Sequence, residues 1–160
     1  MGFRITIKQS SDTKNGDKND ARNGTPDIVL GKEDITIVRT MLDSEDDNNA
    51  KGNHINIIAH IEGKILAPSN NKKHIQTKEV SNWAYLDGTV SIAYRHVIIE
   101  VIANGTVVRK YELPNAYVVD YMEDFSDSSG NGKFSLTIRQ KKDKIKDIDI
   151  KGNYTLPVEQ

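Results

Sequence analysis

The chain has 160 residues and a formal net charge of −1, because 22 lysines and arginines are balanced by 23 aspartates and glutamates. This balance provides no bulk attraction to nucleic acid or to an anionic membrane, and we expect neither as a partner. The absence of cysteine excludes a disulfide framework, a thiolate zinc site and a cysteine nucleophile.

The N-terminal stretch GFRITIKQ predicts a half-buried strand. Its apolar residues Phe3, Ile5 and Ile7 alternate with polar ones and therefore share one face. Residues 9–26 are rich in asparagine, aspartate, glycine and serine, which predicts a long mobile polar loop because such a segment cannot bury a face. A second polar loop is predicted near 43–53. The length of the chain predicts a single domain over 1–160.

Three further strands are predicted before the middle of the chain. The stretch DIVLGKEDITIVRTML (27–42) predicts two short strands around Gly31, and HINIIAHIEGKIL (54–66) predicts one long strand. The residues expected to share a face are Ile35, Ile37 and Met41 in the second of these strands, and Ile55, Ile57, Ala59 and Ile61 in the third.

The hydrophobic period changes in residues 68–88. Ile75, Val80 and Trp83 lie at helical spacings and predict an α-helix that begins between residues 69 and 77. Gly88 is expected to stop this helix. We interpret Trp83 and Tyr85 as a pair that packs the helix onto a sheet.

The second half of the chain predicts two pairs of strands. Asn104-Gly105 predicts a tight hairpin, because both residues tolerate the positive φ angles of its turn. Pro114 is expected to end or redirect the second strand of that hairpin. The stretches 115–125 and 133–142 predict another pair joined by a loose turn, with Tyr117 and Tyr121 on one face. The stretch 147–155 predicts a last short strand.

These patterns indicate a mainly β fold, in the sense of a β-rich α+β class. Successive strands are separated by turns rather than by helical crossovers, which indicates antiparallel pairing. We therefore predict a small antiparallel β-barrel with one flanking α-helix.

The residue patterns contain no recognisable catalytic site. His54 and His60 lie six residues apart on one strand face, but no carboxylate has the spacing that a metal site would need. The two acidic loops lack the ligand and glycine spacing of an EF-hand. The basic run RQKKDKIKD is interrupted by Asp143 and Asp147 and contains no aromatic residue, which argues against a nucleic-acid site. We expect no enzyme, no catalytic residue, no cofactor and no metal.

Residues 90–152 carry a family resemblance. They contain Tyr94 and Arg95 at a strand start, the segment 109–121 with its stretch LPNAYVVDY, the turn at Gly130 and Gly132, and the strand FSLTIRQKK, in this order. This arrangement resembles the C-terminal half of the haemolysin-coregulated-type (Hcp-like) tube proteins. Those proteins belong to type VI secretion and related contractile injection systems and are related to phage tail-tube proteins.

The resemblance implies a structural subunit and not an enzyme. Six copies would close a hexameric ring, and rings would stack into a hollow inner tube that delivers effectors. The implied partners are further copies of the chain and the sheath, spike and effector proteins of the same apparatus. The implied location is the cytoplasm during assembly, followed by export or by incorporation into an extracellular injection particle. The residues that we expect at subunit interfaces are Arg95, Arg109, Pro114, Asn115, Asp120 and Glu123.

Two other functions stay open at this point. The first is a monomeric β-sandwich or β-barrel module that binds carbohydrate or peptide, and it would require an exposed aromatic platform. Only 6% of the residues are aromatic, and most of them fall in predicted strands. The second is a metal-dependent hydrolase that uses His54 and His60, and bound metal would be its signature.

Overall fold

The computed structural model of the chain describes residues 1–10, 27–44, 55–67 and 76–156, apart from the side chain of Lys144. The predicted loops at 9–26 and 43–53 therefore lie almost entirely outside the described residues. At their described ends, β1 (Gly2–Gln9) includes Gln9 and β3 (Ile35–Ser44) continues to Ser44, so the third predicted strand extends two residues into the second predicted loop.

The described strands form one antiparallel sheet, and the mainly β class is confirmed. The main order is β2-β1-β5-β6-β7-β4-β3, and two short strands pair with β6 outside this order. The strands are β1 (Gly2–Gln9), β2 (Ile28–Leu30), β3 (Ile35–Ser44), β4 (Ile55–Ile65), β5 (Arg95–Ala103), β6 (Thr106–Asp124), β7 (Gly132–Gln140), β8 (Asp149–Lys151) and β9 (Tyr154–Thr155).

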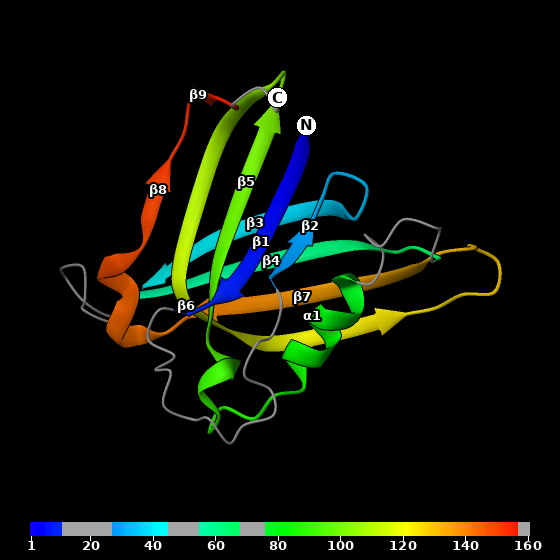
Figure 1. Cartoon of the computed structure of the whole chain (residues 1–160), viewed down its shortest axis with the longest axis horizontal. Helices are drawn as coiled ribbons and strands as arrows, with labels where there is room; N and C mark the ends of the chain where they lie inside the picture. Colours follow the sequence, from blue (N-terminus) through cyan, green and yellow to red (C-terminus); the bar gives the residue numbers. More distant parts are fainter. Residues whose placement is uncertain (11–26, 45–54, 68–75, 157–160) are drawn as a thin grey trace.

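The sheet is bent into two layers whose strands cross, as Figure 1 shows. The first layer consists of β2, β1, β5 and the first half of β6, and the second consists of the second half of β6 with β7, β4 and β3. Strand β6 is 19 residues long and belongs to both layers, because its first half pairs with β5 and its second half with β7. In the described residues β2 and β3 end the ladder without pairing to each other, so the predicted barrel is not closed.

The hydrophobic core lies between the two layers. The first layer contributes Ile5 and Ile99 and the second contributes Ile61, Leu136 and Ile138, all of which are at most 1% exposed. Full burial of such a side chain stabilises the fold by about 1.5–3 kcal/mol relative to exposure. The inward faces predicted for the strands at 2–9 and 54–66 are those that face this core.

The predicted helix is α1 (Gln76–Ala84), which packs against β2 and β6 and flanks the core. Val80 and Trp83 are buried, and the indole Nε1 of Trp83 donates a hydrogen bond to the carbonyl oxygen of Ala93 at 2.9 Å. Ala93 belongs to a short 3-10 helix, η2 (Ser91–Ala93), which leads into β5. The single tryptophan therefore fixes the helix to the segment that begins the central strands.

The end of α1 differs from the prediction in two respects. The helix ends at Ala84 rather than at Gly88. Three residues further on, the Asp87 carboxylate accepts a hydrogen bond from the backbone N–H of Thr89 at 2.9 Å and forms a turn. Tyr85 follows the last helical residue and is 84% exposed, so Trp83 alone makes the predicted packing contact.

The predicted hairpin at Asn104-Gly105 is confirmed, with φ angles of 51° and 71°. Pro114 does not end β6 but lies in a bulge, because Leu113 pairs with Val97 while Ala116 pairs with Arg95. A bulge tolerates proline, which has no N–H to donate to the ladder, and it bends the strand that carries it. Redirection, one of the two predicted effects of Pro114, is therefore what the structure shows.

Tyr117 and Tyr121 lie on opposite faces, contrary to the prediction. The register of β6 against β7 shifts between Val118 and Asp120, and the extra residue reverses the alternation. Tyr121 consequently packs against the core, where its ring stacks on the ring of Phe134 with 6.4 Å between the two ring centroids. Tyr117 points to the other side of the second layer.

The predicted shared face of Ile35, Ile37 and Met41 is wrong for Ile35, whereas the register places Ile37 and Met41 together on the outward face. A register shift between Ile35 and Ile37 interrupts the alternation in β3. Ile35 is buried, whereas Met41 is 56% exposed and faces away from the core. Both errors have one cause, since an irregularity of a single residue exchanges the two faces of a strand.

Candidate assembly surface

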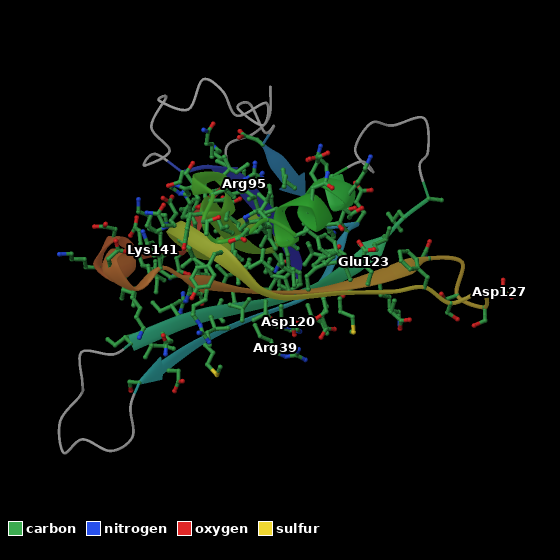
Figure 2. The ribbon with its side chains drawn as sticks, turned by 90° about the horizontal axis from the view of Figure 1, so that it is seen from below. Arg39, Arg95, Asp120, Glu123, Asp127 and Lys141 are labelled. Carbon is green, nitrogen blue, oxygen red and sulfur yellow. The ribbon has the colours of Figure 1, made fainter. Side chains whose placement is uncertain are left out.

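The second layer has one face that no helix or strand of the described residues covers, and it forms the lower side of the sheet in Figure 2. We call this surface the open face. It consists of the outward residues of β3, β4, β7 and the second half of β6. Cross-strand partners share a face, so the register gives its central row, which runs across the four strands as Arg39, His60, Thr137 and Asp120.

The middle of this row is held by a polar network. The His60 ring bonds with Nδ1 to the Thr137 hydroxyl and with Nε2 to the Glu62 carboxylate, both at 3.0 Å. Glu62 also lies 3.4 Å from the Arg39 guanidinium. The hydrogen bond from His60, followed by the charges of His60 and Arg39, lowers the pKa of Glu62, and partial desolvation opposes this shift. The network gives the open face a fixed, mixed-charge centre.

A shallow hollow of about 480 Å³ lies beside this network on the open face. Its lining includes Glu62, Lys64 and Lys133 beside the apolar side chains of Met122 and Phe134, so charges of both signs surround apolar groups. Met122 is 60% exposed on β6, and Met41 is similarly exposed on β3. The open face is therefore neither a dry apolar patch nor a surface of one charge.

Arg95 and Asn115, two of the predicted interface residues, are buried within the chain at 4% exposure each. They belong to a polar cluster at one end of the core, where the Ser10 hydroxyl donates a hydrogen bond to the Asn115 side-chain carbonyl. Gln140 completes this row of the core face, because it pairs with Ala116 and Ala116 pairs with Arg95. The Asn115 backbone carbonyl accepts a hydrogen bond from Lys141, which fixes the bulge of β6 to the end of β7.

Within the part of the chain that the structure describes, the buried Arg95 side chain has one donor, Nη2, without a hydrogen-bond partner, and the same is true there of the Gln140 Oε1 atom. Burial lowers the pKa of Arg95, while the charges of Asp27 and Glu79 act in the opposite direction. In the single chain this arginine is buried and presents almost no charge on an outer surface.

The other four predicted interface residues lie in four different places. Arg109 is exposed on the first layer beside Gly152, and Pro114 is half-buried in the bulge. Asp120 is exposed on the open face, and Glu123 is exposed near the end of β6, where it accepts a hydrogen bond from the Tyr121 hydroxyl at 2.7 Å. Burial and this hydrogen bond raise the pKa of Tyr121. The structure therefore does not bring the six residues together on one surface. Their role in assembly stays a prediction.

Sequence reasoning missed the central row of the open face, apart from Asp120. The signal was present in the stretch HIEGK, in which His60, Glu62 and Lys64 alternate with core residues. Alternation alone does not show which outward residues of distant strands become neighbours. That information requires the register of β3 and β7 against β4.

A metal-dependent hydrolase would need His54 and His60, and a sugar-binding module would need an exposed aromatic platform. His54 lies outside the described residues, and His60 is engaged in the polar network. Within the described ranges, no group of three or more histidine and acidic side chains is placed to hold a metal ion. The exposed large aromatic side chains of this part of the chain are Tyr85 and Phe125, which come from different elements. None of the described helices has the length and apolarity needed to cross a membrane.

An antiparallel sheet bent into two crossed layers, with one helix at its flank, defines the class of fold. Hcp1 from Flavobacterium johnsoniae has a similar fold, with a TM-score of 0.51, 14% identity and coverage of 96% of this chain and 97% of that chain. The resemblance to Hcp-like tube proteins, predicted from residues 90–152, is thus confirmed at the level of the fold.

Two further solved structures match with a TM-score of 0.49 each. One is the six-fold symmetrised baseplate of the anti-feeding prophage, with 12% identity and coverage of 94% of this chain and 93% of that chain. The other is a sheath–tube complex of an extracellular contractile injection system, PVC, in its extended state, with 9% identity and coverage of 94% and 88%. No protein-family model and no curated protein matches the sequence.

Proposed function

We propose that the chain is a structural subunit of the inner tube of a contractile injection or type VI secretion-like apparatus. In this proposal six copies form a ring, rings stack into a hollow tube, and sheath, spike and effector proteins of the same apparatus are the partners. The protein acts by assembly and not by catalysis. It is assembled in the cytoplasm and is then exported or becomes part of an extracellular particle.

The observation that carries this proposal is the end-to-end likeness of the fold to Hcp1, together with the open face. A sheet with a covered face and an uncovered, mixed-charge face suits the wall of a tube. Charges of both signs on the open face would leave passing proteins without a strong attraction to the wall.

The edges of the second layer support the ring. Strand β3 is ten residues long and has a partner on one side only within the described residues, and the second half of β6 also pairs on one side only. Unpaired edges of this length invite pairing with another chain. The row across the open face begins at Arg39 on β3 and ends at Asp120 on β6, so a neighbour placed edge to edge would bring opposite charges together.

Electron microscopy of the purified protein tests the proposal. Negative-stain images should contain rings or tubes, and the mass in solution should include a species of six subunits. A protein that stays monomeric at high concentration would contradict the proposal. Binding of that monomer to a glycan or peptide would favour the binding module instead.

A further inference from the structure

Strand β7 carries opposite charges at its two ends. The end of β6, the turn and the start of β7, residues 123–133, contain Glu123, Asp124 and Asp127 against Lys133, a net charge of −2. The segment after it, residues 141–147, contains four lysines and two aspartates, a net charge of +2. We call these the acidic tip and the basic turn. The basic turn includes the 3-10 helix η3 (Lys142–Asp147).

The two clusters lie at opposite ends of the molecule. Figure 2 shows Asp127 at the tip of the β6–β7 hairpin, which extends beyond the rest of the fold, and Lys141 at the other end of the sheet. Nine residues of extended strand separate them, which corresponds to roughly 30 Å. This separation exceeds the Debye length of about 8 Å at physiological ionic strength, so the clusters cannot neutralise each other within one chain.

Local pairing removes only part of either charge. Lys141 lies 3.6 Å from Asp143 and also sits over the Tyr94 ring, and Asp124 is the cross-strand neighbour of Lys133. Within the described residues, however, Asp127, Lys142 and Lys146 are exposed and form no ion pair. Each end therefore presents charge that remains available to a partner.

The acidic tip also presents an apolar side chain. Phe125 is 66% exposed, although its ring lies over Gly132 and thus has a fixed position. An exposed aromatic residue surrounded by charges has the composition of an interface hot spot, in which the ring provides burial and the charges provide orientation.

We propose that the acidic tip of one copy docks on the basic turn of the next copy, head to tail along β7. This inference rests on the proposed function for the identity of the partner, which is a second copy of the chain. The contact runs along the strands, whereas the ring contact from Arg39 to Asp120 runs across them. The two contacts do not compete for the same surface, so one closes a ring and the other joins one ring to the next.

Paired charge reversals test the contact. The acidic-tip variant carries Asp124→Lys and Asp127→Lys. The basic-turn variant carries Lys142→Glu and Lys146→Glu. Either variant alone should need at least about tenfold more protein to stack, because like charges then meet at the contact. An equimolar mixture should stack again, because each variant supplies the charge that the other lacks. The control Lys32→Glu with Lys78→Glu changes charge elsewhere and should stack like the unmodified protein.

Sedimentation and negative-stain microscopy distinguish the outcomes. Stacking of either variant at the unmodified concentration, or a mixture that fails to stack after both variants have lost stacking, overturns the contact and leaves the ring proposal intact. Charge-dependent head-to-tail association without six-fold rings supports the contact and overturns the ring. An unmodified protein that never associates overturns both. Circular dichroism on each variant confirms that it is folded, so that loss of stacking is assigned to the surface.

Discussion

The two layers of the sheet differ in how far their strand edges are paired within the chain. In the first layer the chain itself supplies the partners, since β8 and β9 complete an edge of β6 and Glu100 pairs with Arg4 at 2.5 Å. In the second layer the edge of β3 and the open face are left without a described element. Within the described residues, the chain therefore pairs more of the edges of its first layer than of its second.

Both layers carry paired charges, since Lys110 lies 2.7 Å from Glu112 on the first layer and Glu62 pairs with His60 and Arg39 on the open face. Asp120 on the open face forms no ion pair within the described residues. Substitutions of core residues in either layer should lower stability, whereas substitutions of exposed residues on the open face should leave stability nearly unchanged and, under the proposed function, weaken association.

The largest effect is expected from Leu136→Ala in β7. Leu136 is fully buried between the layers, and its loss should reduce the free energy of unfolding by about 2–5 kcal/mol. Chemical denaturation measures this change. The matched control is Ser135→Ala, the next residue along the strand on the open face, which should change stability by less than about 0.5 kcal/mol. Equal losses for the two variants would contradict the assignment of the faces.

Gly63→Ala should have the second largest effect. A Cβ atom at Gly63 would lie 2.2 Å from the backbone oxygen of Asp34 and 2.5 Å from the Phe134 ring. We expect a loss of about 1–3 kcal/mol, because backbone cannot move aside as a flexible side chain can.

The comparison for that variant is Gly105→Ala. This glycine has open space around it but a φ angle of 71°, so alanine there should cost about 1 kcal/mol through backbone strain alone. Thermal unfolding of both variants ranks the two effects. A larger loss at Gly105 would show that close packing at the junction of β3 and β4 is less rigid than the distances indicate.

Asp120→Lys should alter assembly and leave folding unchanged. The residue is exposed at the β6 end of the open-face row, so the free energy of unfolding should stay within about 0.5 kcal/mol of the original. Ring formation should weaken, because the new lysine would face Arg39 of the neighbouring copy. Glu33→Lys, an equal charge change in an exposed turn, is the control. Rings that form as before would show that the ring contact lies elsewhere.

The sequence predicted the elements of this fold better than their faces. Alternating isoleucines identified β1 and β4, and Asn104-Gly105 identified a hairpin, because these signals are local. The bulges at Pro114 and Val119 were not predictable as register shifts, since a bulge depends on the partner strand. For the same reason the row from Arg39 to Asp120 could not be assembled from four separate stretches. Arg95 appeared available as a strand-end charge, and its burial results from tertiary packing that the local sequence does not show.

The smallest effect concerns the Lys110–Glu112 pair on the first layer and should depend on pH. Their hydrogen bond lowers the pKa of Glu112 below its ordinary value of 4.5 and raises the pKa of Lys110 above its ordinary value of 10.5. The contribution of Glu112 to stability is therefore fully present above pH 4.5 and is lost as the pH falls through its lowered pKa. The contribution of Lys110 is present below pH 10.5 and is lost as the pH rises through its raised pKa.

Glu112→Gln should consequently reduce the free energy of unfolding by about 0.5–1 kcal/mol near neutral pH, the upper range for such pairs. Urea unfolding at several pH values should show this difference shrinking toward zero below the lowered pKa of Glu112, where the carboxylate of the original protein is protonated as well. Asp149→Asn removes the more exposed pair with Lys151 and should change little at any pH. A difference that persists undiminished in acid would mean that Glu112 stabilises the first layer by packing and not by its charge.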